Sequence, residues 1–229
     1  MEKYNISLII PAYNEEGNIA EAISSSLNIL QQVANEYEII IINDGSSDKT
    51  EEISNAWQEK NQYIKIIHLF SNKGVGNALK MGFNQAKYEL IFWIPGDNQV
   101  KSDDLPKFLS VIENADIVAG FRIKRQDPFI RKFNANLYKI LLFIFFGLKI
   151  KDVDCNKLFR KKVFEKIKIE STGQLIDAEI LIKAKKLKFK IKEIGIPHYP
   201  RIQGFQTGGK IKNIFKAWLE LIKLWKYLK

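Results

Sequence analysis

The stretch YEIIIINDGSSDKT, residues 37–50, decides the fold of this chain. It contains four consecutive isoleucines, residues 39–42, in a run that is too short for a helix and ends at the turn-forming pair Asp44-Gly45. Such a run predicts a strand that is buried on both faces of a parallel sheet. Asp44 would then lie at the carboxyl end of a central strand, where open α/β sheets bind ligands. Alternatively Asp44 only caps its own turn, and the motif alone favours that simpler reading.

The first 120 residues alternate between short apolar runs and amphipathic stretches. The predicted strands are residues 6–10, 39–42, 64–69, 90–94 and 117–120, and the predicted helices are residues 19–30, 53–57, 77–86 and 105–112. This alternation predicts a parallel sheet flanked by helices. Beyond residue 121 the rhythm changes to a basic cluster, an apolar segment (137–148), a mixed polar block (152–160), a helix (175–187), a strand (191–196) and a final helix (211–228).

Composition narrows the class of protein. With 229 residues, 46% of them hydrophobic, the chain is long enough for one well-buried domain. The single cysteine, Cys155, excludes an internal disulfide framework and fits a reducing compartment. The start MEKYNISLII runs directly into a strand pattern and does not resemble a signal peptide, and the longest apolar run, residues 140–148, is too short to span a bilayer. The net charge of +10 suits an anionic partner, or else reflects an ordinary solvated lysine surface.

Polar side chains follow three of the predicted strands, at Asn14-Glu15, Asp44 and Asp97. The chain has no GxxxxGK[ST] phosphate loop and no complete glycine fingerprint for a dinucleotide after its first strand. Because an acidic edge repels a diphosphate, a divalent cation must bridge the two if a nucleotide binds here. Asp97 and Gln99, two residues apart in an extended loop, can present hard oxygen ligands on the same side, although D-x-Q alone is a weak pattern.

Several segments together resemble glycosyltransferase family 2, and within it the dolichyl- and polyprenyl-phosphate sugar synthases. These segments are IIPAYNEEGNI, EIIIINDGSSDKT, FSNKGVGNALKMGFNQA, PGDNQ, DVDCNKLFRKKVF, LIDAEILIKAKKL and EIGIPHYPRIQG. The resemblance covers nearly the full chain. It implies a GT-A type α/β fold with a mostly parallel central sheet, a nucleotide-diphospho-sugar donor, and Mg²⁺ or Mn²⁺ as the cofactor.

The resemblance also assigns roles to individual residues. The implied donor-binding residues are Pro11, Ala12, Tyr13, Glu15, Ile42, Asp44, Gly96, Asp97 and Arg201; the metal ligands are Asp97 and Gln99; and the catalytic residues are Asp97, acting through the metal, with Arg122 and Arg131. Arginine suits these places because its planar fork matches phosphate oxygens.

The chain departs from the family pattern at two positions. The first aspartate of the usual acidic pair is Pro95, which leaves Asp97 as the one carboxylate of that motif. The lysine that usually follows the Arg201-type arginine is Thr207, and Lys210 is the nearest substitute.

The nature of the acceptor depends on whether a general base is present. A hydroxyl acceptor must lose a proton, whereas a lipid phosphate is already a nucleophilic anion and needs cations to hold it. The basic cluster of Arg122, Arg131 and Lys132 fits the second case. Asp177 and Glu179 are the downstream acids that could serve as a base, or they simply begin a helix.

We therefore predict an inverting transfer of a sugar, from a donor such as GDP-mannose or UDP-glucose, to a polyprenyl or dolichyl phosphate. One alternative is a family 2 enzyme with a glycan hydroxyl acceptor, active in cell-surface polysaccharide synthesis. A second alternative is a non-catalytic nucleotide-sugar-binding module. No nucleic-acid-binding motif is recognisable, so we expect no nucleic acid partner.

A lipid acceptor requires contact with a membrane. We predict a glycosyltransferase domain over residues 1–209 and an amphipathic helix over 210–229 that docks on an anionic membrane surface through Trp218, Trp225 and neighbouring lysines. Alternatively this helix packs on the domain, and the segment 137–148 is a second contact or core. The expected location is the cytoplasmic face of a membrane, bound peripherally. His68 and Cys155 are expected to be structural.

Overall fold

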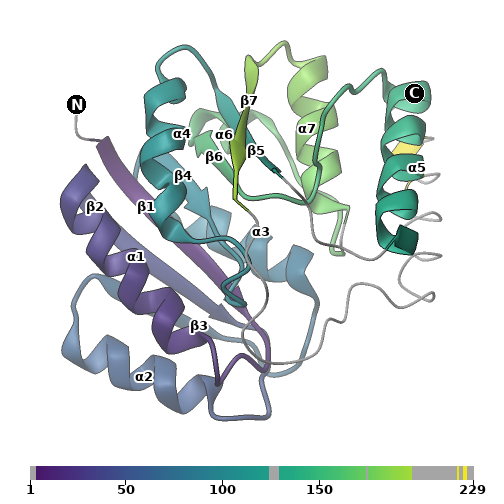
Figure 1. The fold of residues 1–229 in the computed structure, drawn as a ribbon. Coiled ribbons are helices and arrows are strands. Elements are labelled where there is room, and N and C mark those ends of the chain that lie inside the picture. Colours follow the sequence, from purple (N-terminus) through teal and green to yellow (C-terminus); the bar gives the residue numbers. More distant parts are fainter. Residues whose placement is uncertain (1–3, 124–128, 174, 198–220, 222–223, 226–229) are drawn as a thin grey trace.

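The computed structural model describes residues 4–123, 129–173, 175–197, 221, 224 and 225, and for residues 129–133 it describes the backbone alone. The described chain forms one seven-stranded sheet in the order β3-β2-β1-β4-β6-β5-β7, with helices on both sides (Figure 1). The strands are β1 (Tyr4–Ala12), β2 (Ala34–Asn43), β3 (Ile64–His68), β4 (Leu90–Trp93), β5 (Ile117–Arg122), β6 (Lys157–Arg160) and β7 (Ile191–Ile196). The helices are α1 (Ile19–Val33), α2 (Thr50–Lys60), α3 (Val75–Gln85), the 3-10 turn η1 (Ser102–Asp104), α4 (Leu105–Ile112), α5 (Phe129–Phe146), α6 (Lys162–Lys166) and α7 (Ile176–Lys186).

The sheet is mostly parallel, which confirms the predicted fold class. β1 pairs in parallel with β2 and β4, β2 with β3, and β5 with β7. Only β6 runs the other way, antiparallel to both β4 and β5. All strands except β6 therefore point in one direction, and their carboxyl ends share one edge of the sheet. This edge is where an open α/β sheet binds its ligand.

The isoleucine run of β2 shows why the sheet is buried on both faces. Ile39 and Ile41 belong to a core under α1, α2 and α4, whereas Ile40 and Ile42 belong to a second core under α3 and α7. Successive side chains of a strand point to opposite faces, so a run without polar residues needs cover on both sides. In Figure 1, α1, α2 and α4 lie in front of the sheet and α3 lies behind it.

Two elements differ from the sequence-based expectation. The mixed polar block at 152–160 was given no helix or strand, but its second half is β6, inserted between β4 and β5. The apolar segment expected at 137–148 is the later part of α5, which begins at Phe129. β6 was missed because it is only four residues long, and the start of α5 was missed because its first eight residues, FIRKFNAN, mix cations and amides with apolar residues.

Most of the predicted C-terminal helix lies outside the described residues. The described positions Leu221 and Leu224 are buried and share a core with Leu142 of α5, and the ring of Trp225 lies 5.6 Å from that of Phe145. These positions fit the alternative of packing on the domain. Within the described part of the chain, no helix is both long enough and apolar enough to cross a bilayer.

Candidate functional site

The carboxyl ends of β1, β2 and β4 meet at the common edge of the sheet. The amide of Asp44 donates to the carbonyl of Ala12 at 2.9 Å, and Pro11 pairs with Ile42 in the β1–β2 register. A side chain at Gly96 would put its Cβ 3.2 Å from the Pro11 carbonyl oxygen, so only glycine fits there without a shift. The structure therefore brings the donor-binding residues predicted on three separate strands into one place.

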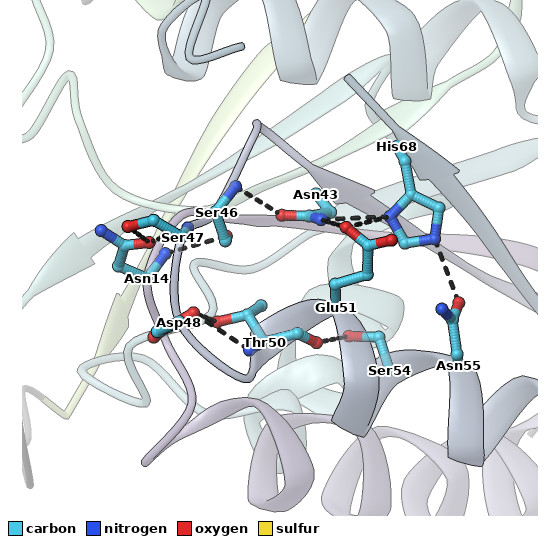
Figure 2. A network of polar contacts seen from close by, with 10 residues as sticks. All are labelled: Asn14, Asn43, Ser46, Ser47, Asp48, Thr50, Glu51, Ser54, Asn55 and His68. Carbon is cyan, nitrogen blue, oxygen red and sulfur yellow. Dashed lines mark hydrogen bonds and ion pairs between the residues drawn. The ribbon is translucent and has the colours of Figure 1, made fainter. Parts of the chain in front are cut away.

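Side chains join the loop after β1 to the loop after β2 (Figure 2). Asn14 has a positive φ of 53°. Its backbone N–H donates to Ser46 Oγ at 3.0 Å, and its side-chain Oδ1 accepts from the backbone N–H of Ser47 at 2.8 Å. The amide of Glu15 donates to Thr50 Oγ1 at 2.8 Å. The motifs NEE and DGSSDKT thus form one hydrogen-bonded unit, a relationship that neither motif reveals by itself.

Asp48 anchors the same unit. Its carboxylate accepts hydrogen bonds from the amide and hydroxyl of Thr50 and from the amide of Glu16. Burial alone would raise the pKa of Asp48, but these hydrogen bonds outweigh it and hold the pKa below its ordinary value.

Asn43 and His68 fix the other side of the β2 loop (Figure 2). Asn43 Oδ1 accepts from the amide of Ser46 at 3.1 Å, so its Nδ2 must be the donor that faces His68 Nδ1, also at 3.1 Å. The neutral ring then carries its proton on Nε2, which donates to Asn55 Oδ1 at 3.0 Å. This arrangement agrees with the structural role expected for His68.

Asp44 is buried and already has partners in the protein. Its Oδ1 accepts from the amide of Lys73 at 2.7 Å, and its Oδ2 accepts from the amide of Gly74 at 2.8 Å. These amides stand at the start of α3, so the carboxylate also faces the positive end of that helix. Asp44 therefore connects β2 to the loop before α3. Its predicted contact with the base of a nucleotide stays a prediction.

The loop after β4 carries the predicted metal ligands. Asp97 and Gln99 are partly exposed, and Asp97 Oδ1 accepts from the amide of Gln99 at 3.1 Å. Between them, Asn98 has a φ of 57° and donates from Nδ2 to the buried carbonyl of Asn18 at 3.1 Å, which holds the loop against α1. Within the described residues, no group of three or more acidic, histidine or cysteine side chains is placed to hold a metal ion by itself. A carboxylate and an amide oxygen fit Mg²⁺ or Mn²⁺ if substrate phosphates supply further ligands.

Arg122 ends β5 at the same edge of the sheet. Its Nε and Nη2 donate to the two carboxylate oxygens of Asp152 at 2.7 and 2.8 Å, and both side chains are nearly buried. Burial alone would lower the pKa of Arg122, but the hydrogen bonds and charge of Asp152 raise it above its ordinary value. This bidentate pair fixes the direction of the guanidinium, and among the described residues its remaining N–H groups have no other hydrogen-bond partner.

A second buried ion pair underlies this region. Lys157 is fully buried, and its ammonium donates to the carbonyls of Val153 and Cys155 and to Asp177 Oδ1, all within 2.6–2.7 Å. The same ammonium lies 5.8 Å from the centre of the Trp93 ring at the end of β4. Burial raises the pKa of Asp177 to about 6 against the lowering effect of Lys157. Lys157 thereby connects β4, β6 and the start of α7.

The sequence did not single out Lys157 or Asp152. Lys157 pairs with Asp177, 20 residues away in the chain, and Asp152 pairs with Arg122, 30 residues away. No local sequence pattern predicts a pair between residues so far apart. Cys155, between them, is buried, and burial raises its pKa to about 12, which agrees with a packed and unreactive thiol.

Glu179 is wholly buried and acts as a brace. Its oxygens accept from the amides of Glu170 and Ser171 at 2.9 and 2.7 Å and from Lys183 Nζ at 2.5 Å. Burial alone would raise the pKa of Glu179, but these hydrogen bonds hold it below its ordinary value. Glu179 is therefore committed to the loop before α7.

The remaining predicted residues fall into two groups. Tyr13 is exposed beside the edge, Glu15 accepts from Asn18 Nδ2 at 2.7 Å, and the side chain of Ile42 belongs to the core. The backbone of Ile42 pairs with Pro11 and Ile67, so its predicted contact with the base of a nucleotide stays a prediction. The side chain of Arg131, the whole of Arg201, and Thr207 and Lys210 lie outside the described residues.

Comparison with known proteins identifies the family. The sequence profile of the family named "Glycosyl transferase family 2" matches residues 7–168, which is more than half of the chain. The chain belongs to glycosyl transferase family 2. The matched region begins in β1 and ends just after α6, so it contains the edge formed by β1, β2 and β4, the Arg122–Asp152 pair and Lys157.

Two kinds of relative stand out among this family 2 chain's matches. The undecaprenyl-phosphate 4-deoxy-4-formamido-L-arabinose transferase of Photorhabdus laumondii is 32% identical over 164 residues, 70% of this chain and 50% of the relative. A dolichyl-phosphate beta-glucosyltransferase of Trichomonas vaginalis is 30% identical over 237 residues, 96% of this chain and 72% of the relative. The chain thus spans about half the length of the first of these relatives.

Solved structures confirm the GT-A fold. The glucosyl-3-phosphoglycerate synthase of Mycobacterium tuberculosis, in complex with Mn²⁺, UDP and phosphoglyceric acid, superposes with a TM-score of 0.77 and 16% identity, covering 97% of this chain and 78% of that one. At this identity the similarity concerns the fold alone.

Proposed function

We propose that the chain is an inverting glycosyltransferase that transfers a sugar from a nucleoside diphosphate sugar to a polyprenyl phosphate. The observation that carries the proposal is the similarity over 96% of the chain to a dolichyl-phosphate glucosyltransferase. The geometry supports it, because the predicted metal ligands Asp97 and Gln99 and the guanidinium of Arg122 lie at one edge of the sheet. We propose that the protein binds peripherally to the cytoplasmic face of a membrane.

The donor would lie over the carboxyl ends of β1, β2 and β4. Gly96 permits close approach of the backbone, and the joined loops after β1 and β2 hold a rigid rim for the base and ribose. Asp97 and Gln99 would hold Mg²⁺ or Mn²⁺. When bound, the metal neutralises charge on the diphosphate leaving group.

The acceptor would approach from the Arg122 side. In the transfer, an oxygen of the lipid phosphate forms a bond to the anomeric carbon while the bond from that carbon to the diphosphate oxygen breaks, which inverts the configuration. The nucleoside diphosphate leaves, and no proton has to be removed. Arg122, pre-oriented by Asp152, would stabilise phosphate charge with its free N–H groups.

The two acids that could serve as a base, Glu179 and Asp177, both have partners within the protein. Glu179 is buried and fully engaged with Lys183 and the amides of residues 170 and 171. Asp177 is buried against Lys157. A lipid phosphate does not need either of them as a base.

A second candidate is transfer to a glycan hydroxyl. Burial raises the pKa of Asp177 to about 6, and a carboxylate with such a pKa is suited to accept a proton near neutral pH. The variant Asp177→Asn distinguishes the lipid-phosphate acceptor from the glycan-hydroxyl acceptor. Under the lipid-phosphate proposal this variant keeps most of its turnover once folded; under the alternative, turnover falls by about a hundredfold or more while donor affinity is unchanged.

The direct test supplies the purified chain with labelled UDP- and GDP-sugars, undecaprenyl phosphate in detergent and Mn²⁺ or Mg²⁺. The expected result is a labelled lipid with one of the donors and its loss upon chelation. Donor binding without any product, on lipid or glycan, would instead support a binding module.

A further inference from the structure

The outer face of α5 is apolar and exposed. Ile140, Phe143 and Ile144 are 54%, 57% and 65% exposed, and their spacing of three and four residues places them on one side of the helix. The opposite side packs into the core through Leu142, which is fully buried. In Figure 1, α5 stands at the edge of the molecule beside α7. We call Ile140, Phe143 and Ile144 the α5 face.

A basic cavity adjoins the α5 face. Its volume is about 270 Å³, and it lies between the end of β5, the middle of α5 and the loop that joins α5 to β6. It is lined by Phe121, Arg122, Ala135, Asn136, Lys139, Lys151 and Asp152. Because Asn136 and Lys139 each stand four residues before a member of the α5 face, the cavity wall and the apolar face are continuous along the helix.

The charge around the α5 face is positive. Asp152 neutralises Arg122, but Lys139 has no hydrogen bond or ion pair with any described residue. The ammonium of Lys151 lies 4.1 Å from the centre of the Phe121 ring, and Lys149 is exposed just beyond the end of α5. Exposed apolar side chains bordered by lysines are the composition of a surface that lies in a membrane interface.

From these features we infer that the α5 face docks on the surface of an anionic lipid bilayer and brings the basic cavity to the level of the headgroups. The inference rests on the proposed function, since a polyprenyl phosphate does not leave the bilayer. A second copy of the chain fits the face less well, because a symmetric contact would bring the same lysines of both copies together.

Vesicle co-sedimentation of the full chain tests the inference, with vesicles of phosphatidylglycerol and phosphatidylcholine. The variant I140S/F143S/I144S is expected to lose more than about tenfold in bilayer partitioning. Phe70→Ser is the matched control, because Phe70 is fully exposed after β3 at the opposite edge of the sheet, and it is expected to bind like the parent chain. Equal binding by the triple variant would overturn the inference, as would self-association that the same triple variant abolishes.

A charge variant and a depth probe sharpen the test. Lys149→Glu should weaken binding to anionic vesicles on the order of fivefold or more, and Lys60→Glu, on α2, should not. Phe143→Trp should be quenched by brominated lipids relative to the parent chain, whereas Phe70→Trp should add no quenching. No added quenching at position 143 would contradict docking through α5.

The two proposals fail in different ways. If the triple variant binds vesicles like the parent chain while both transfer sugar to lipid phosphate in detergent, the docking surface is wrong and the proposed function stands. If no lipid phosphate is glycosylated in detergent while vesicle binding follows the prediction, the proposed function is wrong and the docking surface stands. Nucleotide calorimetry on each variant verifies that the donor side is folded.

Discussion

The carboxylate of Asp44, at the end of β2, holds the amides of both Lys73 and Gly74 at the entrance to α3. Asp44→Ala removes two hydrogen bonds to a buried charged acceptor. We expect a loss of about 1.5–3 kcal/mol in the free energy of unfolding, measured by urea denaturation. If Asp44 also contacts the base of the nucleotide, the affinity for UDP or GDP falls at a temperature where the variant is folded. Normal affinity there would leave Asp44 with its bracing role alone.

The metal assignment depends on Asp97. Asp97→Asn should reduce the metal-dependent affinity for a nucleoside diphosphate by at least about tenfold, because the remaining amide oxygens attract a hard cation only weakly. Calorimetry with UDP and GDP, with and without Mn²⁺, measures this. Asp103→Asn is the control, since Asp103 is exposed in the η1 turn nearby. Equal affinity for the parent chain before and after chelation would contradict a bridging metal.

The Arg122–Asp152 pair should be important for both stability and turnover. Asp152→Ala leaves a nearly buried guanidinium without its partner, which should cost about 3–5 kcal/mol in the free energy of unfolding. The exposed Asp154→Ala should change it by less than about 1 kcal/mol. Arg122→Lys should keep donor affinity but lower kcat for lipid-phosphate transfer, because an ammonium cannot reproduce the planar, two-pronged hydrogen bonding of a guanidinium. Unchanged kcat would remove Arg122 from the acceptor site.

Glu179 gives a pH prediction with a definite sign. Its pKa in the folded chain lies below its ordinary value of 4.5, so the unfolded chain binds the proton more readily. The stabilisation is therefore fully present above pH 4.5 and is lost as the pH falls through the lower, folded pKa. Glu179→Gln should flatten the dependence of unfolding free energy on pH in that acidic window. The exposed Glu165→Gln should not, and identical pH profiles for parent and Glu179→Gln would refute the assignment.

The sequence was most informative where apolar runs lead into turns. The run of isoleucines in β2, and the strands on either side, predicted both the buried parallel sheet and the edge at which Asp44 and Asp97 lie. The resemblance to the family assigned Arg122 to the phosphates, and the structure puts it at the same edge because β5 runs in the direction of β1 and β4.

The contacts between distant residues could not be predicted. Asp152 and Lys157 sit in a block that mixes charged and apolar residues, and their partners Arg122 and Asp177 are near them only after β6 inserts into the sheet. For the same reason, the division of α5 into a packed and an exposed side depends on which elements cover it. The periodicity of the segment alone does not reveal this.

The most direct test of the account compares two acceptors that differ only in the phosphate. The purified chain is given one labelled nucleotide sugar, a divalent metal, and either undecaprenyl phosphate or undecaprenol in detergent, with an oligosaccharide in a third reaction. The account predicts label in the phosphate lipid, in a linkage inverted relative to the donor, and none in the alcohol or the oligosaccharide. Label in the oligosaccharide or the alcohol, with none in the phosphate lipid, would contradict it.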